Sequence, residues 1–179
     1  MQALAVITGG TRGIGRALVE RFLSGGFDVV TCARNTDHLT ALAHEMADRF
    51  PNRQLWAVSA DLAKPSDVTR LLDSITALDR PVAVLINNTG VFIPGQLHNE
   101  PEGVLEQSIE TNLYSAYRLS RGLIGGMIAQ RSAHIVMMCS VASITPYTSG
   151  SSYSVSKYAL YGLTKVLREE MKPHGIKVT

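Results

Sequence analysis

A serine, a tyrosine and a lysine form the part of this sequence with the clearest chemistry. Tyr153 follows Ser140 by thirteen residues and precedes Lys157 by four. On a helix, a spacing of four places the phenol and the ammonium on one face, because positions i and i+4 lie on successive turns. A phenol has an ordinary pKa of about 10, and a neighbouring cation lowers that pKa by stabilising the phenolate. The triplet therefore predicts a proton donor or base that works near neutral pH, in a site able to hold a carbonyl oxygen.

A glycine-rich turn near the start of the chain predicts a nucleotide site. Residues 3–8 form an apolar run typical of a buried strand, and residues 13–24 have the apolar spacing of a helix. Between them, Gly9, Gly13 and Gly15 form the pattern Gly-x-x-x-Gly-x-Gly. Such glycines let the backbone approach a pyrophosphate, which the free N–H groups at the start of the helix bind. Glycines also make ordinary tight turns, so this motif by itself leaves both interpretations open.

Further motifs follow in the order found in the short-chain dehydrogenase/reductase family, and the resemblance covers nearly the whole chain. The loop from Thr8 to Gly15 resembles the family's cofactor loop. Asp61-Leu62 resembles its adenine-contacting acid, and residues 87–90 (Asn-Asn-Thr-Gly) are similar to its Asn-Asn-Ala-Gly motif, with Thr89 replacing alanine. The resemblance implies cofactor contacts at Gly9, Thr11, Arg12, Gly13, Ile14, Gly15, Arg34, Asn35, Asp61, Leu62, Asn88, Gly90, Tyr153 and Lys157.

The same resemblance implies a catalytic tetrad, because Asn112 matches the family position that accompanies Ser140, Tyr153 and Lys157. It implies hydride transfer between a nicotinamide and a carbonyl or carbinol carbon, with Tyr153 transferring the proton and Ser140 binding the substrate oxygen. Lys157 would lower the tyrosine pKa and hold the nicotinamide ribose, and Asn112 would position a water that relays protons from Lys157. Taken singly, each residue fits an ordinary structural role better; the four together favour catalysis.

The end of the second predicted strand indicates which cofactor to expect. An acid there would hydrogen-bond a ribose 2′-hydroxyl and repel a 2′-phosphate, but residues 32–35 read Cys-Ala-Arg-Asn. Arg34 offers a planar, charged fork suited to a phosphate, and Arg12 in the glycine loop is a second cation. Basic residues at these two places resemble the family's NADP-preferring pattern. We therefore expect NADP(H), with solvated surface arginines as the alternative.

Strands and helices alternate along the rest of the chain. Further strands are predicted at 27–32, 54–59, 82–86, 133–138 and 176–179, and further helices at 36–49, 66–78, 101–130 and 153–172. Several of these strands are nearly continuous apolar runs, as in a parallel sheet covered on both faces. We expect a three-layer, doubly wound α/β fold of Rossmann-like type with strand order 3-2-1-4-5-6. Ligands in such folds bind at the carboxyl ends of the strands.

Composition excludes several classes of protein. The chain has 179 residues, of which 45% are apolar and 18% charged, as in a globular protein. Its net charge of +2 is spread without blocks, so nothing indicates nucleic acid or an anionic membrane as a partner. The first residues lack the basic region of a signal peptide, and Cys32 and Cys139 fit reduced thiols. We therefore expect a cytoplasmic protein, without a metal site because the five histidines lack metal-binding spacing.

The end of the sequence departs from the family pattern. Members normally continue past the sixth strand with a segment that contacts the nicotinamide and defines much of the substrate pocket, whereas this sequence stops at Thr179. We interpret residues 1–179 as one Rossmann-like domain, truncated after the start of strand six and lacking the C-terminal substrate-binding segment. Helices such as 101–130 and 153–172 pair across a two-fold axis in the family, so we expect a homodimer or homotetramer.

The expected activity is NADP(H)-dependent transfer of hydride between nicotinamide and a ketone or secondary alcohol. The residues expected to line the substrate pocket, 91–94, 141–142 and 146–152, are a mixture of apolar and small residues that fits a ketoacyl thioester, a sugar-derived ketone or a xenobiotic carbonyl. A 3-oxoacyl-carrier-protein reductase is the leading specific candidate, on the strength of the motif set. A non-catalytic NADP-binding scaffold and an NAD-linked alcohol dehydrogenase are the alternatives.

Overall fold

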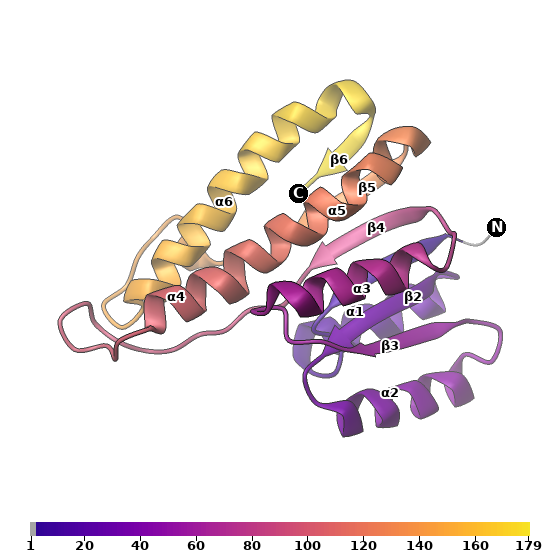
Figure 1. The fold of residues 1–179 in the computed structure, drawn as a ribbon, viewed down its shortest axis with the longest axis horizontal. Helices are drawn as coiled ribbons and strands as arrows, with labels where there is room; N and C mark the ends of the chain where they lie inside the picture. The colour runs from indigo at the N-terminus through magenta and orange to yellow at the C-terminus, as the bar shows by residue number, and fades with distance from the viewer. Residues whose placement is uncertain (1–2) are drawn as a thin grey trace.

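Six parallel strands form the centre of the molecule, in the order β3-β2-β1-β4-β5-β6. The computed structural model describes residues 3–179 (Figure 1), so Met1 and Gln2, where we expected no leader, lie outside it. The strands are β1 (Leu4–Thr8), β2 (Asp28–Ala33), β3 (Leu55–Ser59), β4 (Val82–Asn87), β5 (Ala133–Met137) and β6 (Ile176–Val178). The predicted sheet and its strand order are confirmed, and each predicted strand end lies within one residue of the observed one.

Helices cover both faces of this sheet, which confirms the three layers. They are α1 (Gly13–Ser24), α2 (Thr36–Arg49), α3 (Pro65–Thr76), α4 (Val104–Ile109), α5 (Ser115–Gln130) and α6 (Ser151–Met171). Side chains alternate between the faces of a strand. Accordingly, Ala5 and Ile7 of β1 share one core cluster with α1 and α2, while Leu4 and Val6 share the other with α3, α5 and α6. Burial on both faces explains the continuous apolar runs in the sequence.

The prediction of a helix over 101–130 is wrong in one respect, because these residues do not form a single α-helix. It begins at Val104, after Gly103 in the left-handed region (φ 86°), and a π-helical turn over Glu110–Tyr114 separates α4 from α5. The helix predicted from residue 153 begins earlier, at Ser151, so Tyr153 lies in its first turn. These differences concern the residues nearest to the predicted site. No helix among residues 3–179 has the length and apolar character needed to cross a membrane.

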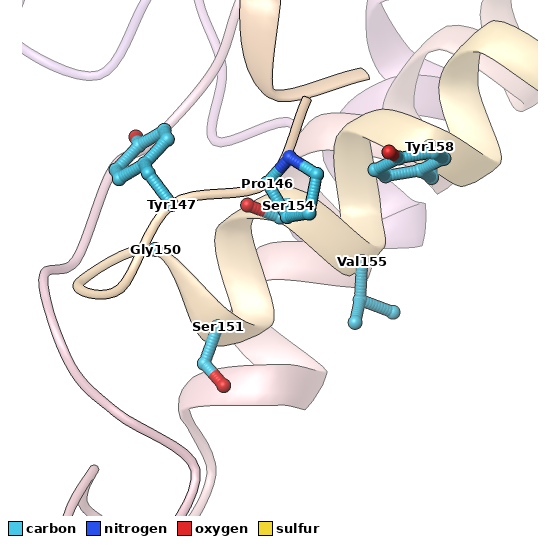
Figure 2. Close-up of a pocket in the computed structure, with 7 residues that line it drawn as sticks. All are labelled: Pro146, Tyr147, Gly150, Ser151, Ser154, Val155 and Tyr158. Atoms are coloured by element: carbon cyan, nitrogen blue, oxygen red, sulfur yellow. The ribbon is translucent and has the colours of Figure 1, made fainter. Parts of the chain in front are cut away.

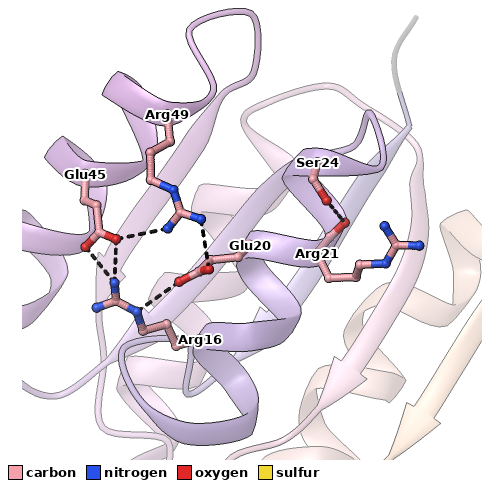
Figure 3. Close-up of polar contacts among 6 residues, drawn as sticks. All are labelled: Arg16, Glu20, Arg21, Ser24, Glu45 and Arg49. Carbon is pink, nitrogen blue, oxygen red and sulfur yellow. Dashed lines mark hydrogen bonds and ion pairs between the residues drawn. The ribbon is translucent and has the colours of Figure 1, made fainter.

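A ring of four charged side chains joins α1 to α2 (Figure 3). Arg16 contacts Glu20 at 3.1 Å and Glu45 at 2.6 Å, and Arg49 contacts the same carboxylates at 3.1 and 3.0 Å. Each carboxylate therefore lies between two guanidinium groups. Hydrogen bonding, chiefly from Arg16, lowers the pKa of Glu45, and hydrogen bonding, chiefly from Arg49, lowers that of Glu20. The ring ties the helix that follows the glycine loop to the helix that follows Arg34.

Glu45→Gln tests whether this ring stabilises the fold. Both glutamates have folded-state pKa values below the ordinary 4.5, so their contribution is complete above about pH 4.5 and is lost as the pH falls through the folded values. We expect the variant to lower Tm by roughly 1–3 °C at pH 7 and to match the unchanged protein near pH 3, in calorimetry at low salt. Asp48→Asn, an exposed change on the same helix, is the control. A Tm difference that stays constant with pH would contradict the role of the ring.

Candidate active site

The predicted site residues converge at the carboxyl ends of β1, β4 and β5. The Asn88 amide, after β4, donates to the main-chain oxygens of Thr8 at 2.8 Å and Gly9 at 3.4 Å, after β1. Lys157 Nζ, on α6, donates to the Met138 carbonyl after β5 at 2.7 Å. Residues far apart in the sequence thus lie at one edge of the sheet, as the topology predicts.

The glycine loop is closely packed and leaves the start of α1 open. Gly9 has φ 71°, and a Cβ built on Gly15 would lie 2.1 Å from the Gly9 oxygen and 2.6 Å from the Asn88 amide nitrogen. Only glycine fits at position 15. Arg12 occupies the N-cap position of α1 without a side-chain cap, and Arg12 and Ile14 are exposed, with Thr11 half-buried. The first N–H groups of α1 are therefore available to an anion.

Thr8 fastens the loop after β4 to the glycine loop, a role that sequence reasoning missed. Its buried hydroxyl accepts from the main-chain N–H of Asn88 and of Thr89, both at 2.9 Å. Together with the Asn88 amide, these bonds join the two loops on either side of the expected cofactor position. Asn87 instead donates to Ser120 Oγ at 3.2 Å and to the Met137 sulfur at 3.3 Å, so its side chain has a structural role.

The other predicted cofactor residues lie after β2 and β3. Arg34 and Asn35 are exposed, and the Asn35 side chain caps α2 by accepting from the His38 N–H at 2.8 Å. Asp61 is half-buried at the end of β3. The Leu62 side chain belongs to the hydrophobic core, with 3% of its surface exposed, so only its main chain remains for a cofactor. Arg34 and Asp61 therefore present their charges at the same edge as the glycine loop.

Asn112 links the loop after β4 to the turn of α6 that carries Tyr153. Its Oδ1 accepts from Val91 N at 2.7 Å, and its amide donates to Val91 O at 3.0 Å and Ser156 Oγ at 2.9 Å. Ser156 Oγ in turn donates to the Tyr153 carbonyl at 2.7 Å. The Asn112 amide is thus already bonded within the protein, and Ser156 is a second residue that the sequence analysis missed. Its position three residues after Tyr153 on a predicted helix was the available signal.

Lys157 is buried, with 5% of its surface exposed, and its ammonium group lies 5.9 Å from the centre of the Tyr153 ring. Burial lowers the pKa of Lys157 below its ordinary value, while the nearby Cys139 thiol acts in the opposite direction. Gly90 lies against this group: a Cβ there would be 3.6 Å from Lys157 Nζ and 3.3 Å from Asn112 Oδ1. The glycine therefore keeps the space beside the ammonium open.

Tyr153 and Ser140 both retain unused hydrogen-bonding capacity. Tyr153 is half-buried, packs edge-on against Phe92 with ring centres 5.0 Å apart, and its hydroxyl has no hydrogen-bond partner among residues 3–179. Ser140 caps a short 3₁₀ turn (Val141–Ser143) that packs on α6, and its Oγ accepts from the Ala142 N–H at 3.1 Å. This bond uses an oxygen lone pair and leaves the hydroxyl hydrogen free to donate. The arrangement offers two O–H donors and one buried cation.

A shallow cavity of about 460 Å³ lies beside this site, over the loop that leads into α6 (Figure 2). Its walls are Pro146, Tyr147, Gly150, Ser151, Ser154, Val155 and Tyr158. Neither Tyr153 nor Lys157 lines it, because these two side chains leave α6 from the neighbouring face. The cavity therefore adjoins the predicted catalytic residues without containing them.

The two cysteines differ in burial, and neither forms a disulfide among residues 3–179. Burial raises the pKa of the Cys32 thiol to about 12. Cys139 is half-buried, with its sulfur 3.8 Å from Thr164 Oγ1, and both thiols are free. Within residues 3–179, no three histidine, cysteine, aspartate or glutamate side chains gather in a group that could hold a metal ion.

Two glycine substitutions test the packing of the cofactor loop. Gly15→Ala would place a methyl group against the rigid Gly9 carbonyl, so we expect a loss of roughly 3 kcal/mol in the free energy of unfolding. Gly13 has φ 55°, but a Cβ at this position would meet no atom within 4 Å, so Gly13→Ala should cost only about 1–2 kcal/mol of backbone strain. Urea unfolding measures both, and equal losses would contradict the steric argument.

Comparison with known sequences identifies the family. The family model for short chain dehydrogenase matches residues 3–179. Dehydrogenase/reductase SDR family member 7B of Bos taurus is 33% identical over 181 residues, covering 99% of this chain and 56% of the relative. A 3-oxoacyl-[acyl-carrier-protein] reductase of Aquifex aeolicus is 27% identical over 98% of this chain and 70% of its own length. The chain thus spans little more than half the length of its mammalian relative.

Comparison with solved structures points to the same family as the sequence comparison. The crystal structure of L-sorbose reductase from Gluconobacter frateurii, complexed with NADPH and L-sorbose, matches with a TM-score of 0.94 and 29% identity. The match covers 99% of this chain and 67% of that one. Motifs, strand order and both comparisons lead to the same conclusion: the chain belongs to the short-chain dehydrogenase/reductase family of oxidoreductases.

Proposed function

We propose that the chain is an NADP(H)-dependent reductase of ketones, able to oxidise secondary alcohols in the reverse direction. The observation that carries this proposal is the unbonded Tyr153 hydroxyl beside the buried Lys157 ammonium, at the edge of the sheet that holds the glycine loop. The L-sorbose reductase supports a ketone as substrate, and the Aquifex aeolicus reductase supports a 3-oxoacyl thioester as the leading candidate.

The residues present fit a nicotinamide dinucleotide. The uncapped start of α1 offers N–H groups to a pyrophosphate, and the space that a Cβ on Gly90 would fill lies beside Lys157. Asp61 follows β3 and Asn88 follows β4, on opposite sides of the glycine loop in the strand order, and they are candidate contacts for the adenine and ribose parts. When bound, the cofactor would supply or accept the hydride, and this chain's side chains would manage the proton and the developing charge.

Tyr153 would donate its proton to the carbonyl oxygen, to which Ser140 would also donate a hydrogen bond. To give up its proton and take it back during the reaction, the phenol needs a nearby cation that stabilises the phenolate form. Lys157 is suited to this because its ammonium is buried. The attraction between opposite charges is stronger in the protein interior than in water. The Met138 carbonyl holds that ammonium in place.

Asn112 would have a structural task in addition to positioning a water. Both its amide donors and Oδ1 already bond to Val91 and Ser156. We infer that this side chain positions the Tyr153 turn of α6, and that the second lone pair of Oδ1 is left to accept a water that relays protons from Lys157.

The preference for NADP(H) rests on Arg12 and Arg34. Both side chains are exposed, and neither forms an ion pair with a carboxylate in the described part of the chain. An unpaired guanidinium is available to a 2′-phosphate, and no acid stands at the end of β2 to repel one. The two free thiols are consistent with the reducing cytoplasm as the compartment.

The outer faces of α5 and α6 carry apolar side chains suited to a second copy of the chain. Val155, Tyr158 and Val166 on α6 are 53%, 42% and 56% exposed, and Tyr117 on α5 is 42% exposed. Their spacing on α6 is that of one helix face. We propose a homodimer or homotetramer through these helices, and sedimentation equilibrium measures the mass that decides it.

Tyr153→Phe tests the proposed chemistry. Without the phenolic proton, we expect carbonyl-dependent NADPH oxidation to fall by about 10²–10⁴-fold, while the Kd for NADPH changes less than twofold. The assay follows NADPH absorbance with an acetoacetyl thioester, L-sorbose and an aromatic ketone. Tyr161→Phe is the matched control, because this tyrosine lies on the same helix and its ring contacts Lys165. NADPH binding without turnover of any carbonyl would favour the non-catalytic scaffold.

Arg12→Ala and Arg34→Ala test the cofactor preference. Each removes a charge-assisted hydrogen bond to a 2′-phosphate, so we expect each to weaken NADPH binding by roughly 10–100-fold and to leave NADH binding unchanged. Calorimetric titration measures both Kd values. Arg21→Ala, an exposed arginine in the last turn of α1, is the control. Equal weakening of NADPH and NADH, or an unmodified protein that binds NADH as tightly, would favour the NAD-linked alternative.

A further inference from the structure

A largely buried carboxylate joins two loops beside Tyr153. Glu100 lies in the segment between β4 and α4, and its Oε1 accepts a hydrogen bond from Ser152 Oγ, in the first turn of α6. Ser152 is buried, with 2% of its surface exposed. The second carboxylate oxygen, Oε2, is also buried and has no hydrogen-bond partner among residues 3–179. Burying an oxygen in this way costs free energy, so the contact calls for a physical explanation.

Main-chain hydrogen bonds also join these two segments, the loop after β4 and the loop that leads into α6. Gly95 N donates to Ser149 O at 3.1 Å, Ser151 N donates to Gly95 O at 3.3 Å, and Gly95 and Gly150 form an isolated parallel bridge. A Cβ on Gly95 would lie 2.7 Å from Glu100 Cβ. Glu100 therefore lies directly over the point where the loop after β4 meets the loop that leads into α6.

These two loops carry Phe92, which contacts the Tyr153 ring, and Tyr147, which contacts Phe92. Phe92, in the loop after β4, contacts the Tyr153 ring at 5.0 Å and the Tyr147 ring at 6.3 Å between centres. Tyr147 stands on the loop that leads into α6, which Figure 2 shows running from Tyr147 through Gly150 to the start of the helix. Any relative shift of the loops would therefore move Phe92 and Tyr147 with respect to the phenol.

The start of α6 lacks the capping side chain that long helices commonly have. Gly150 occupies the N-cap position and offers no side chain, and the 21-residue helix has no side-chain cap. A carboxylate near the start of a helix is favoured by the partial positive charge there. Glu100 supplies such a carboxylate from another segment, and it holds the residue that immediately precedes Tyr153.

We propose that Glu100 is a positioning residue for Tyr153, acting through Ser152. Its carboxylate holds the first turn of α6 and the loop that carries Phe92 in one arrangement. This inference rests on the reductase function proposed above, because proton transfer needs the phenol within hydrogen-bond distance of the substrate oxygen. A displacement of about 1 Å at such a centre can lower the rate by about a hundredfold.

Kinetics of Glu100→Ala, Glu100→Gln and Ser152→Ala in the full chain test the inference. We expect Glu100→Ala and Ser152→Ala each to lower kcat by roughly 10–100-fold, with less than a twofold change in the Kd for NADPH. Glu100→Gln keeps an acceptor oxygen for Ser152 and should restore most of the rate. The double variant Glu100→Ala with Ser152→Ala should be no slower than the slower single variant, because both remove one contact. Glu102→Ala, exposed on the same loop, is the control.

Hydrogen exchange provides a test that needs no turnover. In Glu100→Ala without substrate or cofactor, we expect faster exchange over residues 91–103 and 145–154 and unchanged exchange over β1 and α1.

If no carbonyl supports turnover in the unchanged protein, the reductase proposal fails while exchange still decides whether Glu100 holds the loops. Normal kcat and normal exchange in Glu100→Ala would overturn the inference. So would a Glu100→Gln variant as slow as Glu100→Ala, or a parallel loss of NADPH binding. If Glu100→Ala does not fold, kcat and hydrogen exchange are compared instead between Ser152→Ala, which loses the contact, and Glu100→Gln, which keeps an acceptor oxygen.

Discussion

The burial of the Lys157 ammonium is the constraint on which the arrangement of the site depends. A charge removed from water must be matched by fixed polar partners, or the group loses its proton. Here two partners face the ammonium, the Met138 carbonyl after β5 and the Tyr153 ring on α6, and Gly90 after β4 keeps the remaining space beside it open. The lysine environment therefore exists only while the sheet and α6 keep their relative positions.

Asn112 is the link that maintains those positions. It lies in the π-helical turn between α4 and α5 and bonds Val91 on one side and Ser156 on the other. Ser156 in turn donates a hydrogen bond to the carbonyl of Tyr153, so Asn112 and the Tyr153 main chain are linked. A regular helix over the same residues would turn this side chain to another direction, since a π turn inserts one extra residue into the helical repeat. The irregular segment is thus tied to the position of the phenol.

The two ends of the candidate site differ in how firmly they are held. The glycine loop is fastened by buried main-chain and side-chain hydrogen bonds from Thr8 and Asn88. The proposed substrate side depends on contacts of the loop after β4 with the start of α6 and the loop before it, namely the Gly95–Gly150 bridge, the Glu100–Ser152 bond and the edge-on contact of Phe92 with Tyr153. The proposed cofactor end is therefore part of the rigid sheet edge. The surroundings of the phenol depend on loop packing, which is the part of a fold that opens most readily.

The fold could be predicted closely from the sequence because its signals are local. Continuous apolar runs marked each strand to within one residue, and the glycines marked the turn into α1, since period and turn chemistry act over a few neighbouring residues. The prediction of one helix over 101–130 was wrong because Val91, the partner of Asn112, lies 21 residues away. A contact at that separation produces no periodic pattern in the sequence. Thr8, Ser156 and Glu100 were missed for the same reason, as their bonds connect segments up to 81 residues apart.

By itself, the sequence determined the order of the elements and the residue types available for chemistry, because both follow from local spacing. Tyr153 and Lys157 share a helix face, so their proximity was set before any tertiary contact formed. Only the tertiary structure decided that Lys157 is buried against Met138, that the Asn112 amide is already bonded, and that Glu100 meets the start of α6. Burial and long-range hydrogen bonds depend on which segments pack together, and no spacing within a single segment encodes that choice.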